Sequence, residues 1–214
     1  MKFVTHSHRN AEFVFAGMPK YSRDFREACD VLAGISDEDI ISEFRRKESG
    51  KSLSGALNRL IKGRLVERGW SAESPIFMDD DYGYGGRATK GNGKGKWRLD
   101  FAKGSLCAEV AFNHRSDISW NLLKPTLSSE LNHVEKAIET EGGMVICATE
   151  SLKESGGFDG AVGTFEDYVH YLLPMTHILT APLVIVGLEA PETFYIDVRK
   201  ENGRNRGHVV RLGG

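Results

Sequence analysis

The sequence is poor in cysteine, and its three cysteines lie far apart. Cys29, Cys107 and Cys147 each stand among apolar residues, with no CxxC pair and no cysteine–histidine spacing typical of a metal site. We therefore expect neither a disulfide framework nor a zinc-finger type of site. The three thiols are predicted to be reduced and buried, as is typical of cytoplasmic proteins.

Long apolar runs and a strong charge bias are also missing. No run approaches the roughly 20 apolar residues that a membrane-spanning helix requires, and the opening stretch MKFVTHSHRN lacks the apolar core of a signal peptide. We expect a cytoplasmic protein without a membrane partner. The net charge of −2 over 214 residues does not indicate a nucleic-acid partner. It does not exclude one either, because a local basic face is enough to bind phosphates.

The order of the expected elements indicates an α/β fold. Residues 1–70 are mainly helical in pattern, and residues 97–214 alternate between strands and helices. MVICAT and APLVIVGL are expected to be buried strands, and FYIDVRK and HVVRL a terminal hairpin. Apolar strands separated by helices predict a parallel core covered by helices, with an antiparallel hairpin on one side. We predict a single domain over residues 1–214.

One long helix is expected within residues 97–214, before the strand MVICAT. Apolar residues recur there at spacings of three or four, namely Trp120, Leu123, Leu127, Leu131, Val134 and Ile138. This spacing predicts an amphipathic helix that buries the stripe and ends at Gly142–Gly143.

Residues 79–96 form a glycine-rich basic stretch, DDDYGYGGRATKGNGKGK, that differs from the rest of the chain. It carries Arg87, Lys90, Lys94 and Lys96 and no large aliphatic side chain. This composition predicts a flexible loop. Two interpretations remain open: a plain connection, or a basic flap that becomes ordered on a polyanion.

The stretch RLDFAKGSLCAEVAFN predicts a β-hairpin that carries two acids. Gly104–Ser105 suits a two-residue type II′ turn. That turn places Asp100 directly opposite Glu109, and strand alternation puts both on the same face. The apolar residues take the other, core face, so we expect the two acids on an outer face.

Two ionised carboxylates directly opposite each other repel. Protonation of one acid, a nearby cationic side chain or a bound divalent metal would relieve the repulsion. Lys103 points to the opposite face in this register, so the hairpin itself offers little positive charge. Paired oxygen ligands suit Mg²⁺. The alternative is an exposed hairpin with two ordinary acids, and spacing alone does not decide between them.

The hairpin and the segments after it resemble a known family. Asp-x8-Glu across a hairpin, followed by a polar loop and a helix, is similar to the core of the PD-(D/E)xK nucleases. LDFAKGSLCAEVAFNHRSDISWNLLKP, GGFDGAVGTFEDYVHYLLPM and APLVIVGLEAPETF look like the BglII-type restriction endonuclease family, and the likeness extends from about Leu53 to Phe194. The resemblance implies a three-layer α/β/α core with a mixed central sheet. It also implies a homodimer, Mg²⁺ dependence and cleavage of both strands of a palindromic DNA site.

The resemblance also assigns roles to residues of the hairpin. Asp100 and Glu109 match the two metal-binding acids, and the backbone carbonyl of Val110 would be a further metal ligand. The residue two after the glutamate is usually Lys in the superfamily, and Gln or Glu in the BglII and BamHI enzymes. Here it is Ala111, which can neither hold nor polarise a water. Asn113 lies two residues further along the same face and is the candidate for that task.

Base recognition is expected from the segment Asn113–Ser119, NHRSDIS, where the family's strand passes into a helix beside the DNA. Arginine suits guanine, asparagine suits adenine and aspartate suits cytosine. The candidate DNA-binding residues are Asn113, His114, Arg115, Ser116, Asp117, Lys153, Arg87 and Lys94. The alternative for this segment is a polar loop in which Ser116 or Asp117 caps the following helix. KESGGFDG, which contains Lys153, could equally be an ordinary strand-to-helix loop.

Three functional hypotheses follow. The first is a type II-like, sequence-specific DNA endonuclease that hydrolyses phosphodiester bonds with Mg²⁺. The second is a DNA-binding homologue that has lost cleavage, which Ala111 motivates. The third is a nuclease of the same superfamily that selects DNA structure rather than sequence.

Overall fold

The computed structural model describes residues 1–46, 50–77, 97–130, 136 and 138–213. Its centre is a six-stranded sheet in the order β1-β6-β5-β4-β3-β2. The strands are β1 (Phe3–His8), β2 (Ser71–Pro75), β3 (Arg98–Lys103), β4 (Leu106–Val110), β5 (Gly142–Ala148) and β6 (Leu183–Leu188). β4, β5 and β6 run parallel, whereas β1, β2 and β3 pair antiparallel with their neighbours, so the sheet is mixed.

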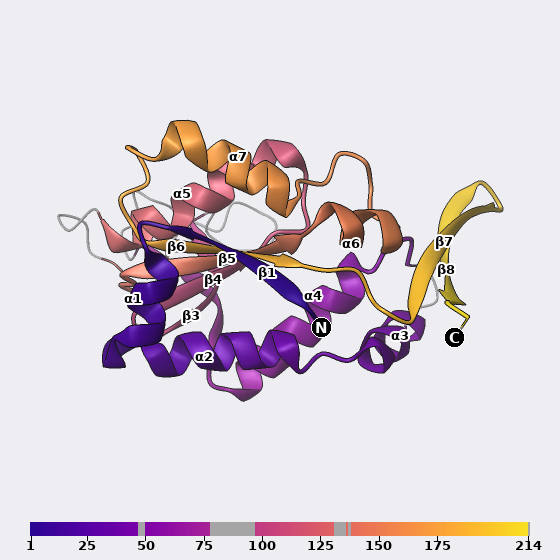
Figure 1. Ribbon diagram of the computed structural model, residues 1–214, viewed down its shortest axis with the longest axis horizontal. Helices are drawn as coiled ribbons and strands as arrows, with labels where there is room; N and C mark the ends of the chain where they lie inside the picture. The colour runs from indigo at the N-terminus through magenta and orange to yellow at the C-terminus, as the bar shows by residue number, and fades with distance from the viewer. Residues whose placement is uncertain (47–49, 78–96, 131–135, 137, 214) are drawn as a thin grey trace, which may run out of the picture.

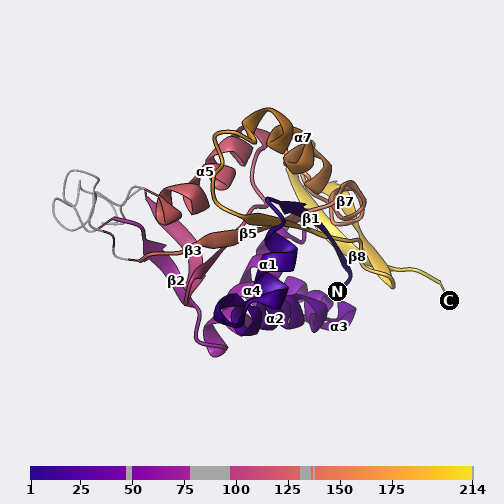
Figure 2. The same cartoon turned by 60° about the vertical axis from the view of Figure 1, so that its left-hand side comes forward.

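Helices cover both faces of this sheet (Figures 1 and 2). One layer is made by α1 (Ala11–Gly17), α2 (Pro19–Ala33), α3 (Asp37–Arg45) and α4 (Ser54–Glu67). The opposite layer is made by α5 (Ile118–Ser129) and α7 (Phe165–Met175). The three-layer α/β/α arrangement with a mixed sheet is therefore confirmed. None of the helices within the described ranges is long and apolar enough to cross a membrane.

The two helical layers bury different strand residues. Toward α1–α4 the sheet buries a large cluster that includes Phe101, Ala108 and Ile146. Toward α5 and α7 it buries a second cluster that includes Ala111 and Val145. Strands that are buried on both faces have nearly continuous apolar sequences. MVICAT and APLVIVGL show this pattern, and β5 and β6 are buried along their whole length.

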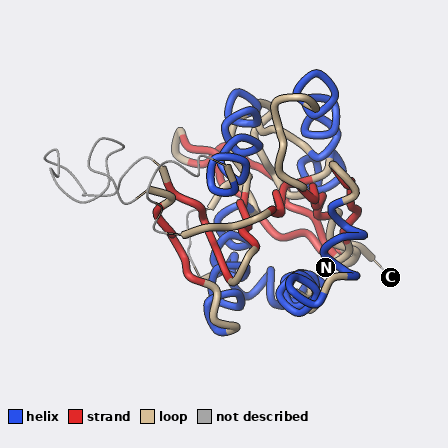
Figure 3. Tube along the Cα trace, turned by 90° about the vertical axis from the view of Figure 1, so that its left-hand side faces the viewer, coloured by secondary structure: helices blue, strands red, loops and turns tan. Residues whose placement is uncertain are grey.

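The parallel strands end at one edge of the sheet, where three connecting segments gather. Residues 111–117 follow β4, residues 149–164 follow β5, and residues 189–193 follow β6. The third segment leads into β7 (Phe194–Glu201) and β8 (Arg204–Arg211), which form a separate two-stranded sheet beside α6 (Glu150–Ser155) (Figure 1). Ligands of open α/β sheets bind beyond the carboxyl ends of parallel strands. The tube view shows the central sheet enclosed between its helices (Figure 3).

Two helices begin with capping boxes. Ser36 and Asp39 form a reciprocal capping box at the start of α3, and Thr164 and Asp167 form one at the start of α7. In each, the hydroxyl accepts from a backbone N–H of the first turn, and the aspartate accepts from the capping residue's own N–H. The second box fixes where α7 begins, and with it the position of Asp167.

The structure corrects the prediction for the helix that contains Trp120. α5 ends at Ser129, and Gly142 and Gly143 belong to β5. A Cβ atom on Gly143 would lie 2.6 Å from Cys107 Sγ, so these glycines allow close strand packing rather than ending a helix.

The buried face of α5 also differs from the predicted stripe. Trp120 is 37% exposed, whereas the buried residues include Asn121, Lys124 and Ser128. Leu131 and Val134 of the stripe lie outside the described residues. The apolar stripe did not predict the buried face of α5 because this helix packs on a polar site. Polar contacts leave no hydrophobic periodicity in the sequence.

β1 was not predicted, because its sequence FVTHSH carries little apolar alternation. The prediction of buried, unpaired cysteines is confirmed: Cys107 and Cys147 are buried and Cys29 is partly buried, and all three are free. Burial raises the pKa of the Cys107 thiol to about 12. This thiol is therefore not poised as a nucleophile.

Candidate active site

The β3–β4 hairpin has the predicted two-residue turn and the predicted register. Lys103 pairs with Leu106 across Gly104–Ser105, and Phe101 pairs with Ala108 further along. Gly104 has φ of 55°, a conformation that favours glycine at this turn position. The same register, continued along the two strands, sets Asp100 opposite Glu109.

Contacts between the strands hold the two acids together. Val110 N–H donates to Asp100 Oδ2 at 2.8 Å, and Asp100 N–H donates to Glu109 Oε1 at 3.3 Å. Each carboxylate thus accepts from the backbone of the opposite strand. The structure brings Asp100 and Glu109 together as predicted from the turn.

The expectation that this pair lies on an outer face was wrong. Glu109 is only 1% exposed, and Ala102, Cys107 and Ala111 on the same face are also buried. Asp100 is half-buried. The reason is that α5 covers this face of β3 and β4. The sequence shows the strand alternation, but not which helix packs above it.

α5 supplies a cationic partner that the sequence did not reveal. Lys124 Nζ donates to Glu109 Oε2, and both side chains are more than nine-tenths buried. Lys103 takes the opposite face, as predicted, where its Nζ lies 2.6 Å from Glu27 Oε1. One sequence feature could have indicated that Lys124 faces the site. It lies at helical spacing from Asn121 and Ser128, two other polar residues on α5.

The pKa of Glu109 is determined by its burial and by two neighbouring charges of opposite sign, those of Asp100 and Lys124. Desolvation is the main cause that raises its pKa, and the nearby Asp100 carboxylate raises it further. The ammonium of Lys124 and the N–H of Asp100 act in the opposite direction. The pKa of Glu109 lies above its ordinary value, so added positive charge at this site favours the ionised form.

The donor set fits a hard divalent cation. Asp100 and Glu109 offer carboxylate oxygens, and Val110 offers a backbone carbonyl beside them. Within the described residues no cluster of three or more His, Cys, Asp or Glu side chains could hold a metal. Mg²⁺ typically takes one or two carboxylates and keeps several waters, whereas structural zinc sites use four protein ligands. The site thus matches Mg²⁺ better than Zn²⁺.

Asn113, the candidate replacement for the residue missing at position 111, is exposed and makes a different contact. Its Oδ1 accepts from Asn121 Nδ2 at 3.1 Å, and the same Nδ2 donates to Tyr168 Oη at 2.7 Å. No hydrogen bond in the described part of the chain joins Asn113 to Asp100 or Glu109. Asn121 and Tyr168 were not singled out from the sequence.

The segment after β4 is held by contacts with residues 161–167. His114 forms a backbone bridge with Val162, and Arg115 Nε lies 2.8 Å from Asp167 Oδ2. Ser116 is exposed. Asp117 occupies the N-cap position of α5 but makes no side-chain cap bond, so the capping interpretation is not supported.

The remaining predicted DNA-binding residues divide into two groups. Lys153 of α6 is largely buried, and its Nζ lies 3.6 Å from Glu150 Oε2. Arg87 and Lys94, with the rest of the glycine-rich stretch, lie outside the described residues.

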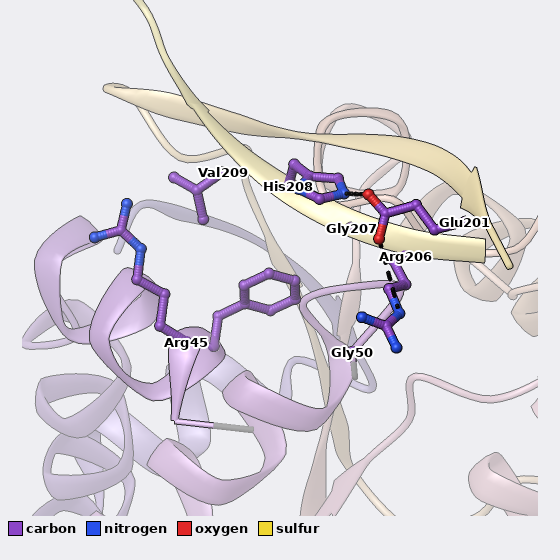
Figure 4. A pocket seen from close by; sticks show the side chains of 8 residues that line it. Arg45, Gly50, Glu201, Arg206, Gly207, His208 and Val209 are labelled. Carbon is purple, nitrogen blue, oxygen red and sulfur yellow. Dashed lines mark ion pairs between the residues drawn. The ribbon is translucent and has the colours of Figure 1, made fainter. Parts of the chain in front are cut away.

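A separate cavity lies between α3 and the β7–β8 hairpin (Figure 4). Its volume is about 360 Å³, and its lining includes Phe44, Arg45 and Arg206. Glu201 there pairs with His208, whose Nε2 lies 2.8 Å from Glu201 Oε1. None of the predicted site residues lines this cavity, and its one carboxylate is already paired. It is therefore not the candidate active site.

Comparisons with known proteins agree with the fold. The family model described as Restriction endonuclease BglII/BglIII matches residues 3–188. A crystal structure of restriction endonuclease BglII complexed with a DNA 16-mer is similar, with 18% identity and a TM-score of 0.66 over 99% of this chain and 100% of that one. The crystal structure of free BglII has 17% identity and a TM-score of 0.55 over the same shares. A search of curated proteins gave no match. Because the family model matches most of its length, the chain belongs to the BglII/BglIII restriction endonuclease family of type II site-specific deoxyribonucleases.

Proposed function

We propose that this protein cleaves both strands of double-stranded DNA at a specific sequence in an Mg²⁺-dependent reaction. The observation that carries the proposal is the fixed carboxylate pair, Asp100 and Glu109, on one hairpin of the sheet. The pair directly precedes the polar segment 111–117 at the carboxyl end of β4. A metal site next to a polar segment able to reach DNA is what sequence-specific hydrolysis requires.

Each residue of the proposed site has its own role. Asp100, Glu109 and the Val110 carbonyl would hold Mg²⁺, which lowers the pKa of a bound water and offsets charge on the phosphate oxygens. Val110 N–H fixes Asp100, and Asp100 N–H fixes Glu109, so both carboxylates are oriented before any ligand binds. Burial under α5 excludes bulk water from Glu109 and strengthens its electrostatic interactions.

DNA contacts are proposed for residues that extend from the same edge of the sheet. The side chain of Arg115 is half exposed, and its guanidinium pairs with Asp167. This ion pair would hold the guanidinium in position to contact a base. His114, Ser116 and Asn113 are also exposed beside it. Asp117 would accept from a cytosine amino group, and Lys153 would contact a phosphate. Arg87 and Lys94, which lie outside the described residues, are also proposed to contact phosphates.

We further propose a homodimer acting in the cytoplasm. The described part of one chain carries one acid pair, whereas cutting both strands of a palindrome takes two symmetric sites. Sedimentation equilibrium of the purified protein tests this, and a monomer in the presence of DNA would contradict it. The free thiols are compatible with a reducing compartment.

The direct test is digestion of unmethylated genomic DNA with Mg²⁺, in parallel with Asp100→Asn. Discrete fragments from the wild type alone support the proposal. Retarded DNA on a gel without any cutting would instead favour a binding protein that has lost cleavage. That alternative is motivated by Ala111, which offers no polar group to a water. Cleavage confined to branched or damaged substrates would favour a structure-selective nuclease.

A further inference from the structure

Position 111 is closed to a large side chain. Ala111 is 1% exposed and packs with Ile118 and Leu122 of α5 and with Val145 of β5. Its backbone N–H donates to Ile146 O at 2.8 Å, so Ala111 continues the pairing of β4 with β5. A longer polar side chain would have to displace α5, because a close-packed interior has no room for added atoms. The absence of a polar residue at position 111 is thus linked to the close approach of α5.

The same approach brings two polar side chains of α5 to the residues on either side of Ala111. Lys124 contacts Glu109, two residues before it, and Asn121 contacts Asn113, two residues after it. Lys124 and Asn121 are one helical turn apart and are both buried. α5 therefore carries the polar groups that the strand lacks at position 111.

We propose that Lys124 takes the place of the missing side chain at position 111 and donates to the attacking water or the scissile phosphate during DNA cleavage. This inference rests on the proposed function. An ammonium in contact with a metal-binding carboxylate lies beside the coordination shell of the ion, where the reacting oxygens gather. A preorganised donor at such a position stabilises charge that develops in the transition state. Lys124 is the buried cation in contact with either acid within the described residues.

A simpler role for Lys124 makes a different prediction. If the ammonium only neutralises Glu109, a bound divalent cation can do the same, and Lys124 becomes dispensable once metal saturates the site. If Lys124 acts on the reacting oxygens, its removal slows cleavage even with the metal site filled. Metal affinity serves as a control under both roles, because removing a positive charge beside a cation site does not weaken cation binding by repulsion. A slower rate at retained metal affinity is therefore not caused by loss of the metal.

The test compares Lys124→Met and Lys124→Arg with the wild type and with Lys103→Met. Lys103 is a matched control: it is a largely buried lysine of the same hairpin, paired with Glu27 on the opposite face. Single-turnover cleavage at saturating Mg²⁺ and enzyme gives the rate of the chemical step. Calorimetry with Mn²⁺ gives metal affinity, and circular dichroism shows that each variant is folded.

We expect Lys124→Met to slow the chemical step by about 10²–10³-fold, the loss typical of removing one preorganised donor. Its Mn²⁺ affinity should be retained, and Lys103→Met should cleave at the wild-type rate. A wild-type rate for Lys124→Met overturns the inference and leaves the proposed function intact. If Lys124→Met does not fold, Lys124→Arg decides: a folded, slower variant supports the inference, and a wild-type rate overturns it. Absence of cutting by the wild type overturns the proposed function and this role together.

Discussion

Lys124 of α5 and Glu109 of β4 form an ion pair that joins the helical layer to the central sheet, with both side chains almost fully buried. Glu109 also accepts from the N–H of Asp100, so one carboxylate connects the lysine to the second acid. A buried pair of this kind contributes little net stability, but removal of one partner leaves an uncompensated charge. The arrangement is therefore better explained by the chemistry of the site than by the stability of the fold.

The first prediction concerns the acid pair. Asp100→Asn and Glu109→Gln each remove a proposed metal ligand, so we expect cleavage to fall by roughly 1000-fold or more, since charge stabilisation by a metal is worth several kcal/mol. DNA retention on a gel in Ca²⁺ should persist. Glu27→Gln, which alters an acid of α2 that pairs with Lys103 on the opposite side of the hairpin, is the matched control. Full activity in Asp100→Asn would exclude this pair as the metal site.

The second prediction concerns pH. Burial, and then the charge of Asp100, raise the pKa of Glu109 above its ordinary value of 4.5. Because the folded-state pKa of Glu109 is raised, its contribution to stability is present below the unfolded pKa and is lost as pH rises through the folded pKa. Metal binds the ionised carboxylate and competes with protonation, so Mn²⁺ affinity should rise with pH across the neutral range. Calorimetry at several pH values measures this, and a flat profile for the wild type contradicts it.

The third prediction concerns Ala111. Ala111→Gln introduces a residue that the family resemblance implies at this position, but the position is packed against α5. We expect a loss of about 1–3 kcal/mol in the free energy of unfolding, as for other overpacked cores, and no gain in cleavage. Urea denaturation measures the loss, with Ala111→Ser as the control for polarity. A stable and more active Ala111→Gln variant would show that α5 leaves room there.

The fourth prediction concerns recognition of the DNA sequence. Arg115→Ala should relax specificity by about 1–3 kcal/mol at one base pair, the discrimination that a good bidentate contact provides. Asp167→Asn should have a weaker effect in the same direction, because Asp167 holds the guanidinium in place. The comparison is the ratio of cleavage rates on cognate and single-mismatch duplexes, with Arg46→Ala, at the C-cap of α3, as the control. An unchanged ratio for Arg115→Ala would remove this residue from the DNA interface.

Local sequence signals predicted the hairpin well. A two-residue turn fixes the pairing of its strands, so Gly104–Ser105 was enough to place Asp100 opposite Glu109. The capping boxes of α3 and α7 are also local, because each is formed by two residues three positions apart. Such features need only a few neighbouring residues, which is why they can be read without the fold.

Contacts between distant segments could not be predicted in this way. Lys124 reaches Glu109 only because α5 crosses β4, and no local pattern encodes that crossing. The leucine stripe of α5 predicted the wrong buried face, since the site below this helix is polar. The burial of the acids was missed for the same reason. The hydrophobic pattern describes the core, whereas the site departs from it.

Sequencing the ends of the DNA fragments tests the central claim most directly. Genomic DNA is digested with Mg²⁺ by the wild type and by Asp100→Asn, and the termini are mapped. We predict that every wild-type terminus falls within one palindromic sequence and that Asp100→Asn produces no such termini. Termini scattered without a common sequence, or equal cutting by Asp100→Asn, would contradict a sequence-specific endonuclease whose metal site is built on Asp100 and Glu109.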